Sequence, residues 1–112
     1  MSDSVEEDDR IVLAFTTVPD PAAGARIGRA IVDERLAACV SRIPEIVSIY
    51  RFEGAVHEDE ESLLVIKTTR RRVAGLERRV IELHPYELPE FVVVDAGAVS
   101  EPYARWIRSV TE

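Results

Sequence analysis

Apolar and polar residues follow one another along this chain in segments whose lengths predict a small mixed α/β domain. The apolar run from Ile11 to Phe15 is too short for a helix before Pro19, so we expect a strand covered on both faces. Asp20-Pro21 is typical of a helix start, with Asp as N-cap and Pro at the first helical position. The expected buried stripe of this helix consists of Ala23, Ile27, Ala30, Ile31 and Ala38.

The segment Ile46 to Thr69 predicts a long β-hairpin. Its first arm, ending at Phe52, is rich in β-branched and aromatic residues, Gly54 marks the turn, and the apolar run from Leu63 to Ile66 returns. Arg42-Ile43-Pro44 is expected to be the connection into this hairpin. Both arms are too long for a compact sheet in a chain of this size, so part of the hairpin should project. A projecting apolar edge needs a partner.

The second half of the chain predicts a helix, a strand and a final helix. Thr68-Thr69 is expected to cap the first of these helices, which Arg70–Arg72 opens and which ends at His84-Pro85 because Pro restricts the residue before it. Phe91–Val94 is another unbroken apolar strand, and Pro102 starts the last helix. The expected buried stripes are Val73, Leu76, Val80 and Leu83 in the first helix, and Tyr103, Trp106, Ile107 and Val110 in the last.

This order of elements predicts an α+β fold, the ferredoxin-like split βαβ sandwich, with a long hairpin and an extra C-terminal helix. In that topology the first and third strands are central and the other two form the edges. The fourth strand lacks the charges that usually protect an edge, so we expect other copies of the chain to cover both edges. Residues 1–9 are predicted to be an acidic mobile tail, and residues 10–112 a single domain.

Composition narrows the classes of function. The net charge of −7 disfavours nucleic-acid binding, which needs a basic surface. No apolar run approaches the roughly 20 residues of a membrane span, and the start of the chain is acidic where a signal peptide would be basic. The single cysteine, Cys39, excludes an intramolecular disulfide and fits a reducing compartment. The expectation is a cytoplasmic protein without nucleic-acid or membrane partners.

No enzyme signature occurs in the sequence: there is no P-loop, GxGxxG, CxxC, HExxH or nucleophile elbow. The apolar residues before Cys39 favour a small buried hydrophobe over a reactive thiolate. An enzyme that uses a cleft carboxylate such as Glu90 is the least favoured hypothesis, since no acid–base pair or activated nucleophile is visible. A non-enzymatic protein is therefore expected.

One polar group of residues, in the loop after the second helix, is a candidate site. It contains His84, Tyr86, Glu87 and Glu90. Imidazole and carboxylate can share a divalent transition metal, and copper or zinc suits imidazole, so the predicted metal ligands are His84, Glu87 and Glu90. The alternative, which we favour on the sequence alone, is that His84 only ends the helix and hydrogen-bonds its last carbonyl groups.

Two charged segments also have two interpretations each. Val56–Glu61 carries His57 and four acidic residues, which is either a ligand cluster or, as we favour, a solvated strand end that discourages aggregation. Arg70–Arg72 places three positive charges in the first turn of a helix, where the helix dipole disfavours them. This run is either a contact for an anion or acidic partner or, as we favour, a solvated face.

Several short motifs together resemble the CutA family of divalent-cation tolerance proteins. They are TVPD at Thr17–Asp20, LAAC at Leu36–Cys39, IYRFEG at Ile49–Gly54, IKTT at Ile66–Thr69, HPYELPE at His84–Glu90 and YxxWI at Tyr103–Ile107. They occur in order from about Ile11 to Ile107. The resemblance implies a ferredoxin-like subunit, similar to the signalling PII proteins, that forms a tight trimer in which hairpins pair between subunits.

The resemblance also implies where copper would bind. The proposed copper ligands of the family are a cysteine at the end of the first strand and histidines before the Pro-Tyr; this sequence has Thr16 and Leu83 at two of these positions and keeps His84. Phe52 replaces the usual hairpin tryptophan. The implied function is a non-enzymatic homotrimer of divalent-cation tolerance that binds Cu²⁺ or another divalent transition metal weakly.

The alternative function is a PII-like signalling module that binds a small anion or metabolite in clefts between subunits and contacts a partner protein. The candidate ligand-binding residues are Lys67, Tyr86 and Thr16, together with the Arg70–Arg72 run.

Overall fold

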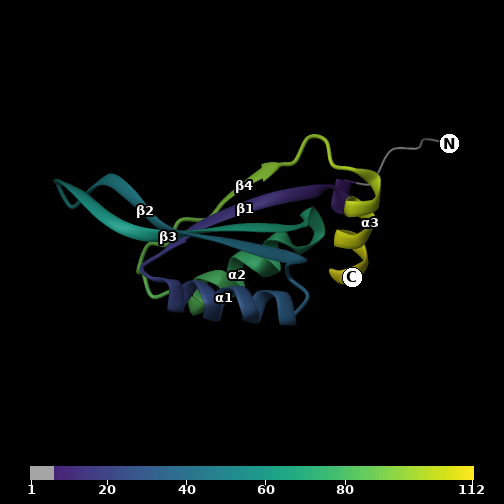
Figure 1. Ribbon diagram of the computed structural model, residues 1–112, viewed down its shortest axis with the longest axis horizontal. Helices are drawn as coiled ribbons and strands as arrows, with labels where there is room; N and C mark the ends of the chain where they lie inside the picture. Colours follow the sequence, from purple (N-terminus) through teal and green to yellow (C-terminus); the bar gives the residue numbers. More distant parts are fainter. Residues whose placement is uncertain (1–6) are drawn as a thin grey trace.

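The computed structural model describes residues 7–112 as a four-stranded antiparallel sheet with the strand order β2-β3-β1-β4 (Figure 1). This order confirms the predicted split βαβ topology, with β1 and β3 central and β2 and β4 at the edges. Helices α1 and α2 cover one face of the sheet, and α3 lies at one end of it (Figure 1). The elements are η1 Glu7–Asp9, β1 Ile11–Val18, α1 Pro21–Asp33, β2 Cys39–Phe52, β3 Ala55–Thr69, η2 Arg70–Arg72, α2 Val73–Leu83, β4 Val92–Asp95 and α3 Glu101–Val110.

Helix α1 starts as its sequence predicts and ends before Ala38, the last residue of the predicted stripe. The side chain of Asp20 accepts a hydrogen bond from the backbone N–H of Ala23 at 2.8 Å, with Pro21 in the first turn. The helix ends at Asp33, and the chain then turns through Arg35 at a φ of 63°. The prediction that Ala38 lies on the helical stripe is therefore wrong, although Ala38 is buried, because it packs with α3.

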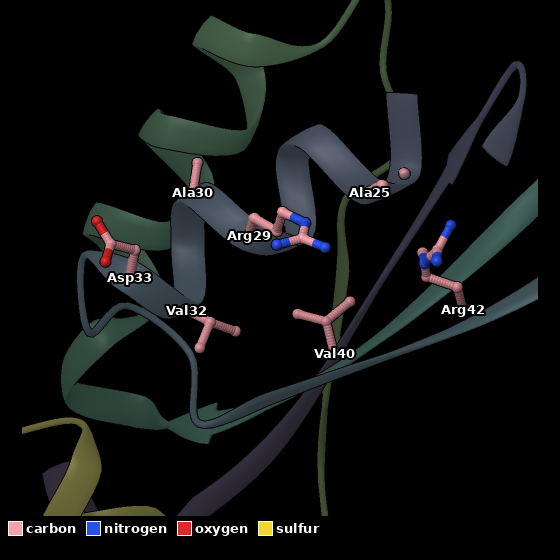
Figure 2. A pocket seen from close by; sticks show the side chains of 9 residues that line it. Ala25, Arg29, Ala30, Val32, Asp33, Val40 and Arg42 are labelled. Carbon is pink, nitrogen blue, oxygen red and sulfur yellow. The ribbon is translucent and has the colours of Figure 1, made fainter. Parts of the chain in front are cut away.

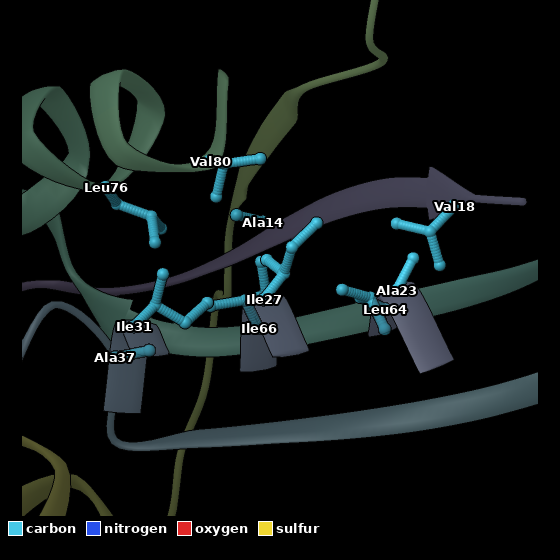
Figure 3. Close-up of a cluster of buried hydrophobic side chains, with 10 residues drawn as sticks. All are labelled: Ala14, Val18, Ala23, Ile27, Ile31, Ala37, Leu64, Ile66, Leu76 and Val80. Carbon is cyan, nitrogen blue, oxygen red and sulfur yellow. The ribbon is translucent and has the colours of Figure 1, made fainter. Parts of the chain in front are cut away.

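The main core lies between the sheet and the helices α1 and α2 (Figure 3). Strand residues point alternately to the two faces, so every second residue of β1 and β3 enters this core. The buried cluster consists of Ala14, Val18, Ala23, Ile27, Ile31, Ala37, Leu64, Ile66, Leu76 and Val80. The predicted stripes of the first two helices are confirmed at their central positions.

A second, smaller cluster fixes α3 to the end of the sheet. It contains Ile11, Ala38, Ala104 and Ile107. The expectation that Tyr103 and Trp106 are buried is wrong for this chain, since they are 40% and 42% exposed with ring centroids 5.5 Å apart. The last helix meets only the sheet end, so its buried face is narrower than its apolar stripe.

Strands β2 and β3 form the predicted long hairpin. Their last pair joins Phe52 and Ala55, so the turn has two residues, Glu53 at a φ of 51° and Gly54 at 81°. Positive φ at both positions is the signature of a type I′ turn, whose twist matches that of the strands. The described chain measures 55 × 25 × 22 Å, and the hairpin tip extends beyond the helices along the long axis (Figure 1). The predicted projection is thereby confirmed.

A β-bulge interrupts β2 where the sequence predicted a connection. The pairing runs from Ile43 opposite Leu63 to Ile46 opposite Glu61, which leaves one extra residue on β2. The prediction that Arg42-Ile43-Pro44 is a connection is wrong, because an edge strand accepts Pro at a bulge. Before the bulge the odd-numbered residues of β2 lie on one face of the sheet, and beyond it the even-numbered residues lie on that face.

The sheet face away from α1 and α2, which we call the open face, is apolar. It carries Leu13, Phe15, Ile43, Leu63, Val65, Val92 and Val94, none of which belongs to either core cluster. Ile43, Val92 and Val94 are 46%, 50% and 42% exposed. Among the elements of residues 7–112, only α3 packs against this face, and only at its end near Ile11.

The Arg70–Arg72 run is bonded to its own chain. The Arg70 guanidinium donates to a carboxylate oxygen of Asp95 at 2.6 Å, and this hydrogen bond raises the pKa of Arg70 and lowers that of Asp95. Arg71 pairs with Asp9 at 2.8 Å, and Arg72 donates to the carbonyl oxygen of Thr111. These partners lie within the chain, so the run is neither a free anion contact nor simply a solvated face.

The predicted boundaries at the N-terminus and at α2 shift in the structure. Glu7–Asp9 form the short 3-10 helix η1, and the Asp9 carbonyl oxygen accepts from Arg108 at 2.9 Å, so these residues are anchored where a tail was expected. The rest of that predicted tail lies outside the described residues. The predicted cap of α2 is wrong: Thr69 makes no capping bond, and Thr68 donates to the Leu36 carbonyl oxygen at 2.7 Å.

None of the helices in residues 7–112 has the length and apolar character needed to span a bilayer.

Replacing Ile27 by Ala tests whether the core between the sheet and α1 determines stability. Ile27 is fully buried, so the variant loses side-chain contacts and leaves a cavity, and its free energy of unfolding should fall by about 2–5 kcal/mol. The matched control is Ile81→Ala, at a helix position that is 47% exposed, which should change it by less than about 0.5 kcal/mol. Urea unfolding at one fixed protein concentration measures both, and equal losses would contradict the assigned core.

Candidate functional site

Both ring nitrogens of His84 are hydrogen-bonded, one to the loop after α2 and the other to β1. Its Nδ1 accepts from the backbone N–H of Tyr86 at 3.1 Å, so the proton lies on Nε2, which donates to the Thr17 carbonyl oxygen at 2.8 Å. The side chain is buried, at 8% exposure. His84 ends the helix as the alternative interpretation predicted, although its partners are these two groups and not the last helical carbonyl groups.

Tyr86 connects the same loop to β3. Its hydroxyl donates to Glu61 Oε2 at 2.7 Å, and its ring centroid lies 4.8 Å from that of His84. Burial and the bond to the Glu61 carboxylate raise the pKa of Tyr86 well above its usual value. The loop is therefore held in place by hydrogen bonds to both central strands.

Glu61 is a buried carboxylate, at 8% exposure, in a segment that the sequence predicts to be solvated. That prediction is confirmed for the exposed neighbours Glu58 and Glu60 and wrong for Glu61. Its only hydrogen bond within residues 7–112 is the one from Tyr86, and it forms no ion pair there. The sequence does not distinguish Glu61 from the acidic residues beside it, because its burial depends on a loop that arrives from 25 residues away.

A cavity of about 560 Å³ lies between the hairpin and this loop. Aromatic side chains line it from both sides, with Tyr50 and Phe52 on β2 and Tyr86 on the loop. Its charged lining residues are Glu61, Glu87, Glu90 and Arg51. Its remaining lining residues are Thr17, Ser48, Pro85 and Leu88. The cavity is thus partly aromatic and mainly acidic.

The bulge in β2 brings the aromatic side chains to this cavity. Cross-strand partners share a face, so Tyr50, opposite His57, lies on the same face as Glu61. The Tyr50 ring stacks on His57 with centroids 5.4 Å apart, and its hydroxyl donates to Asp59 at 2.5 Å. That hydrogen bond is the main cause of the raised pKa of Tyr50. His57 is therefore part of an aromatic pair on the hairpin.

The three predicted ligand-binding residues lie in three different environments. Tyr86 lines the cavity. Lys67 lies among the residues of the open face, where its ammonium group donates to Ser41 at 2.5 Å and to Cys39 Sγ at 3.7 Å. Thr16 is fully buried on the helix side of the sheet, and its Oγ1 has no hydrogen-bond partner within residues 7–112. The structure does not bring these residues together, so it offers no single anion pocket built from them.

The predicted metal ligands do not fit a metal ion held by one copy of the chain. Both ring nitrogens of His84 are already hydrogen-bonded, and Glu87 and Glu90 are exposed. Across residues 7–112, His, Cys, Asp and Glu side chains nowhere gather in groups of three or more that could hold a metal ion. Thr16 stands where the resemblance implies a cysteine ligand, and its hydroxyl has no hydrogen-bond partner within residues 7–112. This chain therefore has fewer copper-binding side chains than the resemblance implies.

A second hollow, of about 700 Å³, lies between α1 and the edge strand β2 (Figure 2). Small residues line it, including Gly24 and Gly28, together with Arg29, Asp33 and Arg42. Arg42 donates to the Pro21 carbonyl oxygen at 3.1 Å, so its charge is directed to the backbone of α1. None of the predicted site residues lines this groove.

Comparisons with known proteins agree on one family. The sequence profile described as CutA1 divalent ion tolerance protein matches residues 12–110. The human Protein CutA is 43% identical over 99 residues, which are 88% of this chain but only 55% of the human protein, so the chain spans about half the length of that relative. The Divalent-cation tolerance protein CutA of Thermus thermophilus is 44% identical over 99 residues, 88% of this chain and 96% of that protein.

A solved structure has the same fold. The crystal structure of CutA from Xylella fastidiosa matches this one with a TM-score of 0.90 at 38% sequence identity, covering 92% of this chain and 99% of that one. The match extends over most of the chain.

Replacing Tyr86 by Phe tests the hydrogen bond from the loop to the buried carboxylate of Glu61. The variant leaves the Glu61 carboxylate buried without a donor, so the free energy of unfolding near neutral pH should fall by about 1–3 kcal/mol. Because the pKa of Tyr86 is raised in the fold, wild-type stability should also decline as the pH rises above about 10, the ordinary value of a tyrosine, and this part of the decline should be absent in the variant. Chemical unfolding across that pH range measures both effects.

Tyr50→Phe is the control for this substitution. It removes the same kind of bond, to Asp59, on the exposed hairpin, and a much smaller loss of stability is expected there. A loss as large as that in Tyr86→Phe would show that burial of Glu61 does not determine the effect.

Proposed function

This chain belongs to the CutA1 divalent ion tolerance protein family, and on that premise we propose that it acts as a non-enzymatic homotrimer in tolerance of divalent cations. The family name describes tolerance of an ion and names no reaction. The cytoplasmic location expected from the sequence stays a prediction.

The open face is the observation that carries the trimer proposal. An apolar surface such as the one formed by Phe15, Val65 and Val94 is unfavourable in water and marks an interaction site. It is continuous with two unpaired strand edges, β2 and β4, each of which offers backbone groups to a further strand. Two different edges on one subunit favour head-to-tail contacts, and such contacts can close into a ring. The number three comes from the resemblance to the family.

A metal site belongs to this proposal only in a form that more than one copy builds. His84, Glu87 and Glu90 would then contribute to a site for Cu²⁺ or another divalent transition metal, with further donors from a neighbouring copy. His84 would have to give up its bond to Thr17 or to the Tyr86 backbone, which is consistent with weak binding. The PII-like alternative has no comparable support, because Lys67, Tyr86 and Thr16 lie apart.

Placing a charge on the open face tests the trimer. Wild-type protein should have a solution mass close to three times 12.5 kDa. Val94→Glu should shift the mass toward that of one chain, because an apolar interface does not accept an unpaired carboxylate. Ile81→Glu places the same charge on the exposed side of α2 and should leave the mass unchanged.

Light scattering on a sizing column measures the mass, and circular dichroism checks that each variant is folded. A folded wild-type protein with the mass of one chain in dilute solution would refute the homotrimer.

Calorimetric titration with Cu²⁺ and with Zn²⁺ tests the metal role. His84→Ala should weaken binding at least about tenfold, the scale typical of disturbing a metal-site residue. His57→Ala removes the other histidine, on the exposed hairpin, and should leave binding within error. An unchanged isotherm for His84→Ala would remove His84 from the site, and no heat with either metal in wild type would refute metal binding.

A further inference from the structure

Within residues 7–112, the open face carries one lysine, Lys67, and no arginine. Lys67 lies opposite Leu13 on β1 and Cys39 on β2. Its ammonium group donates to Ser41 at 2.5 Å and to Cys39 Sγ at 3.7 Å, and it forms no ion pair in the described part of the chain. An ammonium group has three N–H donors, so one donor and the positive charge itself have no partner there.

Glu61 is the complementary group on the same face. It precedes Lys67 on β3 by an even number of residues, and such side chains share one face of a strand. Its side chain is buried, at 8% exposure, and the bond from the Tyr86 hydroxyl to Oε2 is the only hydrogen bond that it accepts among residues 7–112. A buried carboxylate is costly unless a cation or several donors compensate it, so Glu61 requires a positive charge that its own chain does not supply.

These two charges cannot meet within one copy of the chain. A strand rises about 3.3 Å per residue, so residues 61 and 67 lie about 20 Å apart along β3, far beyond the range of an ion pair. When other copies cover the open face, both charges lose their water, and each is compensated only if an opposite charge faces it across the interface. A head-to-tail contact brings different patches of two copies together, so Lys67 of one copy can face Glu61 of the next.

The cavity beside Glu61 has the lining that a lysine side chain requires. Tyr50, Phe52 and Tyr86 line it together with Glu61. The methylene stem of a lysine packs on apolar surface while its ammonium group keeps polar partners, and the faces of aromatic rings attract that ammonium group. The cavity therefore offers an apolar wall for the stem of Lys67 and a carboxylate for its charge.

We propose that Lys67 of one copy enters this cavity in the next copy and forms an ion pair with Glu61 there. The inference rests on the proposed homotrimer and deepens it, because it names the residue that each copy contributes to the contact. The cavity is then a site between subunits, incomplete in one copy and closed by assembly. The ion pair also fixes how the copies align, because another alignment leaves both charges buried and unpaired.

A double-mutant cycle tests this ion pair through the urea midpoint at which the protein loses its trimer mass, measured by light scattering at one fixed protein concentration. Glu61→Gln still offers an oxygen to Tyr86, and Lys67→Met keeps an unbranched apolar stem. Each single substitution leaves one buried charge unpaired and should lower the midpoint. The double variant buries no unpaired charge, so its midpoint should lie closer to that of wild type than either single variant. Within one copy, sites about 20 Å apart contribute additively, so this result requires contact between copies.

Glu60→Gln combined with Lys67→Met is the matched control. Glu60 is the exposed neighbour of Glu61, and it lies on the opposite face of β3. The shift that Glu60→Gln causes should simply add to that of Lys67→Met.

Additive shifts for Glu61→Gln and Lys67→Met would overturn the proposal. A lower midpoint in Glu61→Gln without one in Lys67→Met would also overturn it, because another basic residue would then occupy the cavity. A wild-type protein with the mass of one chain would refute the homotrimer itself, whereas a trimer with additive shifts would refute only the ion pair. The two failures are therefore distinguishable.

Because Lys67 is the only lysine of the chain, a second measurement can identify its partner independently of stability. A carbodiimide joins an amine to a carboxylate that contacts it, as an amide. Treatment of the wild-type trimer should join two copies through Lys67 and Glu61, as identified by mass spectrometry of the peptides, and Glu61→Gln should abolish this product. A product that joins Lys67 to a different carboxylate would contradict the assignment.

Discussion

Helices cover only one of the two faces of the sheet, and the other features of this molecule follow from that imbalance. A chain of 112 residues supplies α1 and α2 for one face, while α3 reaches only the end of the other. The apolar side chains of the open face are unfavourable in water, and within residues 7–112 only α3 at one end and the loop after α2 at the other contact this face. The same shortage of elements leaves β2 and β4 as free edges. Association between copies is the solution that we propose for both.

The β-bulge at Pro44-Glu45 has a comparable influence on the candidate site. One additional residue in β2 moves Tyr50 and Phe52 to the face that also carries Glu61. The loop after α2 then closes over this face, held by His84 through the Thr17 carbonyl and by Tyr86 through the Glu61 carboxylate. The cavity is therefore formed by a local irregularity of one strand together with two long-range hydrogen bonds.

Acidic residues and the lysine lie at different positions along the same face of the sheet. The cavity is mainly acidic, whereas the only lysine lies on the open face and is bonded to a hydroxyl and a thiol. Four arginines form ion pairs within the described residues, among them Arg70 with Asp95, and Arg79 with Glu34 between α2 and the end of α1. Glu34 lies directly after α1, in line with the apolar stripe of that helix. Its charge is compensated by Arg79 of α2.

The sequence by itself determined the element order, the central and edge strands, the hairpin turn and the stripes of α1 and α2. These follow from hydrophobic periodicity, Pro and Gly positions and capping residues, which act over a few neighbours in the chain. It also identified Tyr86 and His84 as the polar residues of the α2–β4 loop. Only the tertiary structure decided that both nitrogens of His84 are occupied, that Glu61 and not Glu60 is buried, and that Thr16 points away from the cavity. Each of these depends on strand register or on contact between distant segments. A bulge of one residue reverses which side chains share a face, and no local pattern in the sequence records it.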